Sequence, residues 1–155
     1  MCTIYKAEYN DLREILNLQY FAYQSEAELF GSKDIPPLKQ SLYEVIDEFK
    51  NGVILKMTDE NDVIIGSVRA KESKDSVYIG KLFVHPSHRQ KGCGTRLLKA
   101  IESCFPNKRY ELFTSTRSKD NIRLYQKLGY KIFNVRKIND EPEFVYMEKE
   151  CKNEL

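Results

Sequence analysis

The most constraining feature of this sequence is a strand-like segment that runs through a glycine-containing turn into an amphipathic helix. Val77 to Val84 has the mixed apolar character of a strand, and the turn Arg89 to Gly94 follows it closely. Apolar residues then recur at helical spacing over Thr95 to Cys104. Glycines let a ligand approach the backbone, and the first N–H groups of a helix are unpaired donors at the positive end of its dipole. This junction therefore predicts an anion-binding site.

Two common phosphate-binding patterns do not fit the turn. A P-loop needs Gly-Lys followed by Ser or Thr, and the dinucleotide fingerprint needs a third glycine where Leu97 stands. The turn taken alone is equally compatible with a glycine-rich connection whose basic residues are solvated. The short turn therefore leaves a ligand site and a purely structural connection as open alternatives.

The remaining sequence predicts one α+β domain over residues 1–155. A chain of 155 residues, 41% hydrophobic and 31% charged, is long and apolar enough to form one core. Turn and cap residues divide it in the order β-α-α-β-β-β-α-β-α-β-β, which favours a mixed sheet. The predicted strands are Thr3 to Ala7, Gly52 to Thr58, Val63 to Arg69, Ser76 to Val84, Arg109 to Thr114, Tyr130 to Ile138 and Glu143 to Lys149. The predicted helices are one capped by Asn10, one through Leu42 to Phe49, and those over Thr95 to Cys104 and Asn121 to Leu128.

A second motif lies further along the chain, on a short predicted helix that Ser118 or Asp120 caps. The motif consists of Asn121, Tyr125, Gly129 and Tyr130. Together with the Arg89 to Gly94 turn and the order of elements, it resembles the GCN5-related N-acetyltransferase family over nearly the whole chain. Two motifs on the expected elements are more specific than either motif alone.

The resemblance implies a three-layer α/β/α fold with a mostly antiparallel central sheet, and acetyl-CoA as a co-substrate without a metal. The strands that carry Phe83 and Leu112 are expected to separate and open a wedge where thioester and amine meet. The first strand would pair with pantetheine through its backbone, the turn would bind the pyrophosphate, and Asn121 would contact the pantetheine arm. The implied cofactor-binding residues are Leu82, Phe83, Val84, Arg89, Gln90, Lys91, Gly92, Cys93, Gly94, Thr95, Asn121 and Tyr125.

Tyr125 is the catalytic residue that the resemblance implies. It would lie near the sulfur, and its hydroxyl, with an ordinary pKa of about 10, suits protonation of the CoA thiolate. The acceptor must attack as the neutral amine, while a backbone N–H near Leu82 or Phe83 polarises the acyl oxygen. No general base is predicted, because Val77 to Val84 contains no Glu or Asp, and a water relay and an acceptor that arrives neutral stay open as alternatives. Without the family, Tyr125 would be interpreted as a core aromatic on an amphipathic helix.

The predicted function is transfer of an acetyl group to a primary amine of a small molecule or of a peptide or protein. The alternative is a non-catalytic CoA-binding module. The acceptor side is expected on the first two helices, their connection and the last hairpin. The candidate acceptor residues are Phe21, Tyr23, Glu26, Glu28, Phe30 and Asp34. They suit a cationic amine through charge pairing and cation–π contact, but a charged, solvated helix end is the commoner explanation and the one favoured.

Charge and hydropathy argue against other partners. The formal net charge is only +2, so any electrostatic site must be local. Arg89, Lys91 and Arg96 supply mobile positive charge around the turn. Together with Lys99 and nearby Lys81 they form a basic cluster, but this cluster lacks the interleaved aromatics of a nucleic-acid surface, and nucleic-acid binding is not predicted. No run approaches membrane-spanning length, and Met1 to Leu12 lacks the apolar segment of a signal peptide. The oligomeric state stays open, with a homodimer among the alternatives.

Cysteine and histidine positions favour structural roles. Cys2, Cys93, Cys104 and Cys151 are scattered without a Cys-x-x-Cys pair, which indicates free thiols in a reducing cytoplasm. Cys93 would sit beside the pyrophosphate, far from the acyl group, so it is interpreted as a small packing residue rather than a nucleophile. His85 and His88 have no completing ligands at metal-site spacing and are interpreted as surface histidines in a loop.

Overall fold

A seven-stranded sheet forms the middle layer of the protein. The computed structural model describes residues 2–30, 35–137 and 143–150. The strand order is β1-β2-β3-β4-β5-β7-β6, and the pairs are antiparallel except β4 with β5. The strands are β1 Thr3–Lys6, β2 Val53–Thr58, β3 Ile64–Ser73, β4 Ser76–Val84, β5 Arg109–Ser115, β6 Lys131–Lys137 and β7 Glu143–Glu150. This confirms the predicted α+β class and the mostly antiparallel sheet.

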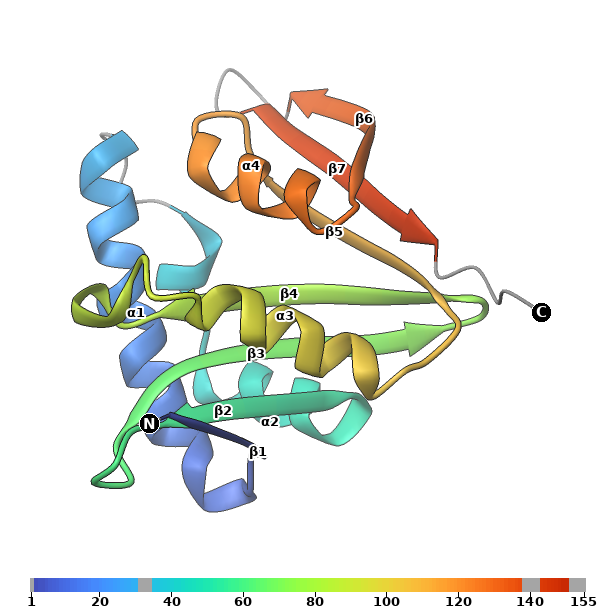
Figure 1. Ribbon diagram of the computed structural model, residues 1–155. Helices are drawn as coiled ribbons and strands as arrows, with labels where there is room; N and C mark the ends of the chain where they lie inside the picture. Colours follow the sequence, from blue (N-terminus) through green and yellow to red (C-terminus); the bar gives the residue numbers. More distant parts are fainter. Residues whose placement is uncertain (1, 31–34, 138–142, 151–155) are drawn as a thin grey trace.

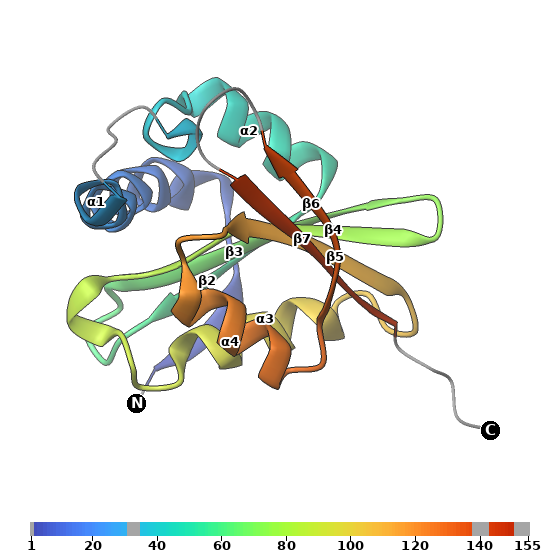
Figure 2. The ribbon, with the colours of Figure 1, turned by 90° about the horizontal axis from the view of Figure 1, so that it is seen from above.

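Helices cover both faces of the sheet. The helices are α1 Leu12–Phe30, α2 Leu42–Asn51, α3 Cys93–Ser103 and α4 Lys119–Lys127, with short 3-10 helices at Tyr9–Asp11, Pro36–Leu38 and Pro86–His88. Seen from above, α1 and α2 lie on one side of the sheet and α3 and α4 on the other (Figure 2). The element order and the three layers are those predicted.

Each face of the sheet has its own hydrophobic core. Leu97, Leu98 and Ile101 of α3 are fully buried against one face. Ile15 of α1 and Val45 of α2 are fully buried against the other. Full burial of such an aliphatic side chain stabilises the fold by about 1.5–3 kcal/mol. The spacing of apolar residues therefore fixes which face each helix turns to the sheet.

A buried polar network holds α1 and α2 on the sheet. Arg69 of β3 is 4% exposed and donates to Gln19 of α1 over 2.6 Å and to Glu48 of α2 over 2.9 Å. Gln40, just before α2, accepts from the same guanidinium over 2.9 Å. A buried charge is tolerated only when it is paired. This network therefore fixes the position of α1, which supplies one wall of the pocket described below.

Helix starts differ from several sequence-based predictions. The prediction that Asn10 caps α1 was wrong, because a 3-10 turn capped by Glu8 precedes the helix and includes Asn10. At α3, the αL conformation of Gly92, with φ 80°, allows the helix to begin at Cys93 rather than at Thr95. At α4, Ser118 occupies the N-cap position and Asp120 lies inside the helix. Both helices therefore begin two residues before their predicted starts.

Strand boundaries were predicted more closely. The bounds of β4 are those predicted, and most other strand ends lie within one residue of the prediction. β3 is the exception, because it continues from Arg69 to Ser73 as the partner of β4 in a long hairpin. The predicted end of β6 at Ile138 lies outside the described residues.

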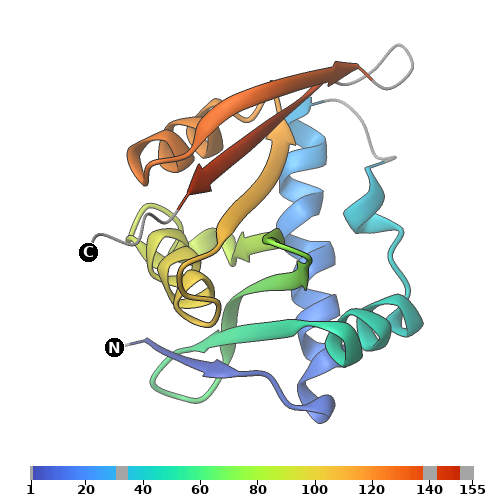
Figure 3. The ribbon, with the colours of Figure 1, turned by 90° about the vertical axis from the view of Figure 1, so that its right-hand side faces the viewer.

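The sheet splits between β4 and β5. Their parallel ladder contains only the pairs Ser76 with Arg109, Val77 with Tyr110 and Tyr78 with Glu111. β4 then continues to Val84 while β5 turns away with β7 and β6 (Figures 1 and 3). The predicted separation of the strands that carry Phe83 and Leu112 is therefore confirmed. Beyond Tyr78, no strand among the described residues pairs with the edge of β4 that faces β5.

Candidate functional site

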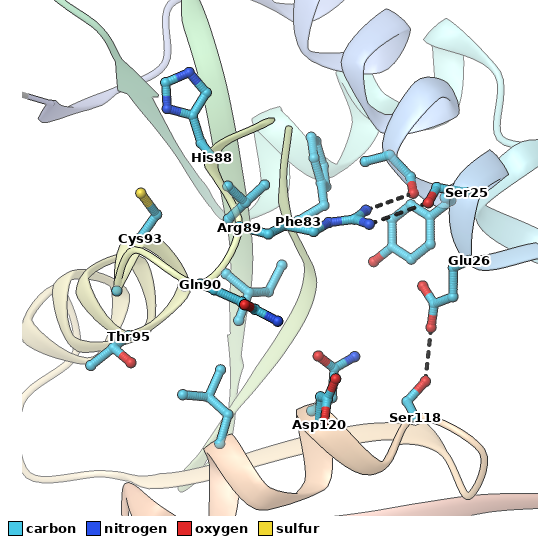
Figure 4. Close-up of a pocket in the computed structure, with 18 of the residues that line it drawn as sticks. Ser25, Glu26, Phe83, His88, Arg89, Gln90, Cys93, Thr95, Ser118 and Asp120 are labelled. Atoms are coloured by element: carbon cyan, nitrogen blue, oxygen red, sulfur yellow. Dashed lines mark hydrogen bonds between the residues drawn. The ribbon is translucent and has the colours of Figure 1, made fainter. Parts of the chain in front are cut away.

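A pocket of about 570 Å³ opens where the sheet splits. Four elements line it: the second half of α1, the end of β4, the start of α3 and the start of α4 (Figure 4). The lining residues are Ala22, Tyr23, Ser25, Glu26, Leu82, Phe83, Val84, His88, Arg89, Gln90, Gly92, Cys93, Gly94, Thr95, Arg117, Ser118, Lys119, Asp120, Asn121 and Leu124. All predicted cofactor-binding residues line it except Lys91 and Tyr125.

The α3 N-terminus presents unpaired amides to this pocket. The first intrahelical bond runs from Arg96 N to the Gly92 carbonyl over 3.1 Å, so the N–H groups of Cys93, Gly94 and Thr95 precede it. In the part of the chain that the structure describes, no side chain caps Gly92. Within that same part, a Cβ at Gly92 would meet no atom within 4 Å, and one at Gly94 would meet only Leu124 Cδ2, at 3.6 Å. The turn therefore offers open space next to a positive helix end, which fits a phosphate group.

A β-bulge reshapes the end of β4. Ser67 pairs with Phe83 while Arg69 pairs with Gly80, so β4 has one more residue than β3 in this interval. Lys81 takes up the difference in the left-handed region, with φ 50°. As a result Ile79 packs on the α3 side of the sheet whereas Phe83 packs on the α1 side. The bulge thus sets the direction of the backbone groups at Leu82 and Phe83 along the open edge.

Hydrogen bonds fix two of the three charges that the sequence suggested to be mobile. Arg89 reaches across to α1 and donates to the Ala22 carbonyl over 3.0 Å and to Ser25 Oγ over 3.2 Å (Figure 4). Arg96 donates to the Cys2 carbonyl over 2.8 Å. Lys91 is exposed. The interpretation as mobile charge was therefore wrong for Arg89 and Arg96, because nearby backbone carbonyls orient both guanidinium groups.

Lys81 does not belong to this basic cluster. Its Nζ lies 4.0 Å from Glu48 Oε2 of α2, on the other side of the sheet from α3. Burial lowers the pKa of Lys81 most strongly, while the Glu48 charge opposes that shift. The predicted cluster around the turn therefore lacks one of its members.

Glu26 and Tyr23 line the part of the pocket that α1 forms, and the buried Tyr125 does not line it. Glu26 Oε1 accepts a hydrogen bond from Ser118 Oγ over 2.8 Å, which joins α1 to the start of α4. Tyr23 lines the pocket, with its ring 6.0 Å from that of Phe83. Tyr125 is only 6% exposed and belongs to the hydrophobic core that contains Leu97. Burial first, and the Glu26 charge second, raise the pKa of both tyrosines above the ordinary value, so both hydroxyls are protonated at neutral pH.

Only part of the predicted acceptor group lies in the pocket. Tyr23 and Glu26 line it, whereas Phe21 is 52% exposed and stacks on His85 at 5.1 Å instead. Glu28 is exposed. The Phe30 side chain and Asp34 lie outside the described residues. Helix periodicity explains why only some of the α1 residues reach the pocket, because Ala22 and Glu26 are one turn apart on the same face of α1.

Sequence reasoning missed the contribution of the α1 backbone and of the segment before α4. Ala22, Ser25 and Arg117 line the pocket without belonging to either motif. Ser118 was considered only as a cap, but its hydroxyl donates to Glu26 instead of accepting from the helix. In the sequence, the position of Ser118 three residues before Asn121 is the only local feature that could have indicated a role for Ser118 in the site.

Cys93 and His85 take structural positions, whereas His88 lines the pocket. Cys93 is 6% exposed and packs in the α3 core, and burial raises the pKa of its thiol. His85 accepts a hydrogen bond from the Ser87 backbone through Nδ1 over 3.0 Å. Among the described residues, no group of three His, Cys, Asp or Glu side chains is placed to hold a metal ion. Within the same ranges, no helix has the length and apolarity needed to cross a membrane.

The fold and pocket define a class of protein: a three-layer α+β domain with a ligand pocket at a split in its sheet and a helix N-terminus at one end. The sequence also matches the model of the GNAT acetyltransferase domain over residues 18–151. The chain therefore belongs to the GNAT acetyltransferase family.

Comparison with solved structures gives the same fold. The PaiA N-acetyltransferase of Thermoplasma acidophilum, in complex with coenzyme A, superposes with a TM-score of 0.81 at 16% identity, covering 97% of this chain and 99% of that one. The ribosomal-protein-S18-alanine N-acetyltransferase of Escherichia coli gives 0.79 at 16% identity, covering 99% and 96%.

A curated relative is longer than this chain. The "UPF0157 protein YqkA" of Bacillus subtilis (strain 168) is 27% identical over 120 residues, which cover 77% of this chain and 34% of that protein. The match thus spans about a third of the length of that relative.

Proposed function

We propose that this chain is an acetyl-CoA-dependent N-acetyltransferase that acts on a primary amine of a small molecule or of a peptide or protein. One observation carries the proposal: the unpaired amides of Cys93 to Thr95 and the unpaired edge of β4 open into the same pocket. The first suits a diphosphate and the second an extended amide-containing chain. Acetyl-CoA has both parts in one molecule.

The residues present fit this co-substrate. The amides of Cys93, Gly94 and Thr95 would bind the diphosphate, with the side chain of Gln90 at the same end of the pocket. Leu82 to Val84 would hold pantetheine through backbone hydrogen bonds, and Asn121 would contact it from α4. The Cβ atoms missing at Gly92 and Gly94 leave space for the phosphate oxygens.

Acetyl-CoA would supply the activated acyl group that the amine attacks. A backbone N–H near Leu82 or Phe83, directed by the bulge at Lys81, stabilises the negative charge that develops on the acyl oxygen. Tyr125 gives its proton to the departing sulfur. Its raised pKa keeps the hydroxyl protonated over the whole neutral range.

The alternative is a CoA-binding protein without catalytic activity. The position of Tyr125 favours this alternative, because the hydroxyl expected to act as the acid belongs to a residue that does not line the pocket. Tyr23 is a second candidate acid, since it lines the pocket and its hydroxyl is also protonated at neutral pH.

Two measurements on the wild-type protein decide between these functions. Calorimetry with acetyl-CoA measures binding, and thiol release in the presence of a primary-amine panel measures transfer. Binding together with amine-dependent thiol release supports the enzyme. Binding without release above background across the panel supports the binding module, and absence of binding contradicts both.

A further inference from the structure

Glu26 is the one carboxylate that projects from α1 into the pocket. It lies one helical turn after Ala22, on the face of α1 that also carries Tyr23 and Ser25. Figure 4 shows the carboxylate directed at Ser118, across the space between α1 and α4. The Ser118 hydroxyl is 8% exposed and holds Oε1 over 2.8 Å. The carboxylate is therefore fixed in position by a partner that carries no charge.

The second carboxylate of the pocket differs from Glu26. The Asp120 side chain is 90% exposed and pairs with Arg123 over 3.0 Å. Glu26 forms no ion pair among the described residues, and Oε2 has no hydrogen bond there. An unpaired carboxylate beside apolar rings attracts a cation more strongly than an exposed, already neutralised one.

The surroundings of Glu26 suit the carbon chain of an amine as well as its charge. Tyr23 and Phe83 pack edge to face at 6.0 Å and both line the pocket. Their rings present an apolar wall next to the carboxylate, which favours alkyl groups and adds cation–π attraction. Phe83 also belongs to the open edge of β4, so this wall connects Glu26 with the strand proposed to hold the thioester.

We propose that Glu26 binds the ammonium group of a cationic primary amine and takes one proton from it, which leaves the neutral amine that attacks the thioester. This inference rests on the proposed function. The steps balance as follows: after Glu26 has taken the first proton, the amine nitrogen bonds to the acyl carbon and the C–S bond breaks. The sulfur takes a proton from a tyrosine, the nitrogen gives its second proton back to that tyrosinate, and Glu26 releases its proton to solvent. Ser118 is a positioning residue, because it acts by holding Oε1.

The charge of Glu26, the proposed proton acceptor, also affects the tyrosines proposed as acids. The charged and titratable groups that line the pocket with Glu26 are Tyr23 on α1, His88 and Arg89 before α3, and Arg117, Lys119 and Asp120 at the start of α4. Tyr125 on α4 does not line the pocket but interacts with the Glu26 charge. Arg89 is committed to Ala22 and Ser25. The Glu26 charge raises the pKa of Tyr23 and Tyr125, so the same carboxylate that attracts the amine keeps the phenols protonated.

The test compares Glu26→Gln with Glu28→Gln. Glutamine keeps the size of Glu26 and an oxygen that accepts from Ser118 but removes the charge, and Glu28 is an exposed residue of the same helix. The amine probes are n-butylamine, putrescine and a peptide with a free N-terminal alanine, and n-butanol is the neutral comparator. Thiol release gives kcat/KM, and titration of the CoA-bound protein followed by NMR gives amine affinity without turnover.

We expect Glu26→Gln to lower kcat/KM for the best amine by about 30-fold or more and to weaken its binding to the CoA complex by about tenfold or more. The affinity for acetyl-CoA and the behaviour of Glu28→Gln should match the wild type, and Glu26→Asp should recover part of the loss. n-Butanol, which carries no charge, should bind the wild type and Glu26→Gln with equal affinity.

The outcome separates this inference from the proposed function. If the wild-type protein releases no thiol with any amine, the enzymatic function fails, but the NMR titration still decides the role of Glu26. Amine binding that is lost in Glu26→Gln supports the carboxylate as the amine site. The inference is overturned if Glu26→Gln and the wild type have equal amine affinity and equal kcat/KM. It is also overturned if the wild-type CoA complex binds no amine.

Discussion

Replacing Gly94 by aspartate should separate ligand binding at the α3 N-terminus from folding. Gly94 is the second residue of α3, and a Cβ there makes only an ordinary 3.6 Å contact with Leu124 Cδ2. A carboxylate in the first helical turn stabilises a helix by about 0.3–1 kcal/mol. The free energy of unfolding should therefore stay unchanged or rise slightly. Gly92 is less suitable, because its φ of 80° makes any substitution strained.

The same carboxylate should repel a diphosphate strongly. Two like charges about 5 Å apart repel by about 3 kcal/mol at an effective dielectric constant of about 20. This energy corresponds to a loss in affinity of about 150-fold. Calorimetry measures the dissociation constant of acetyl-CoA, and thermal unfolding without ligand measures stability. Gly94→Asn is the matched control, since it has the same shape without the charge and should weaken binding much less.

The result that would refute this reasoning is specific. If Gly94→Asp has wild-type stability and binds acetyl-CoA within about threefold of the wild type, the diphosphate does not lie at this turn. If Gly94→Asn weakens binding as much as Gly94→Asp, space rather than charge governs the turn, and the electrostatic part of the account is wrong.

Three further perturbations test other parts of the structure. Tyr125→Phe should lower kcat while leaving the affinity for acetyl-CoA nearly unchanged; if Tyr23→Phe shows the loss and Tyr125→Phe does not, Tyr23 is the acid. The pKa of Tyr125 is raised in the folded protein, so its stabilising contribution is present below the ordinary tyrosine pKa and is lost as pH rises toward the folded value. Above about pH 10, the free energy of unfolding should therefore fall more steeply in wild type than in Tyr125→Phe. The difference in slope should reach up to about 1.4 kcal/mol per pH unit. Denaturant titrations over this pH range measure both slopes, and equal slopes would contradict the prediction. Arg69→Ala should lower the free energy of unfolding by about 2 kcal/mol, because the amide oxygen of the fully buried Gln19 loses its donor, whereas Glu48 is 35% exposed and can be hydrated. A loss below about 0.5 kcal/mol would show that the network contributes little.

Local chemistry made much of the fold predictable. The capping box of Ser41 with Glu44, whose mutual bonds measure 3.2 and 2.9 Å, marks the start of α2 directly in the sequence. The apolar spacing of α3 gave its buried face in advance. Asn10 was misassigned as a cap because a 3-10 turn that begins earlier competes for the same cap chemistry, and the sequence does not rank the two.

Only the part of the pocket that is formed by one continuous segment of the chain was predictable from the sequence. The turn from Arg89 to Gly94 is contiguous, so its residues could be predicted to act together. The pairing of Glu26 with Ser118 joins residues 92 positions apart, and no local pattern encodes that distance in space. The bulge at Lys81 is equally hidden, because it depends on the register with β3 and a lysine in the left-handed region is unusual.

The most direct test of the central claim is a crystal structure of the protein with acetyl-CoA. The account predicts the diphosphate at the N–H groups of Cys93, Gly94 and Thr95 and the pantetheine along Leu82 to Val84. A nucleotide bound elsewhere, or a turn closed by its own side chains with acetyl-CoA bound away from the split in the sheet, would contradict it.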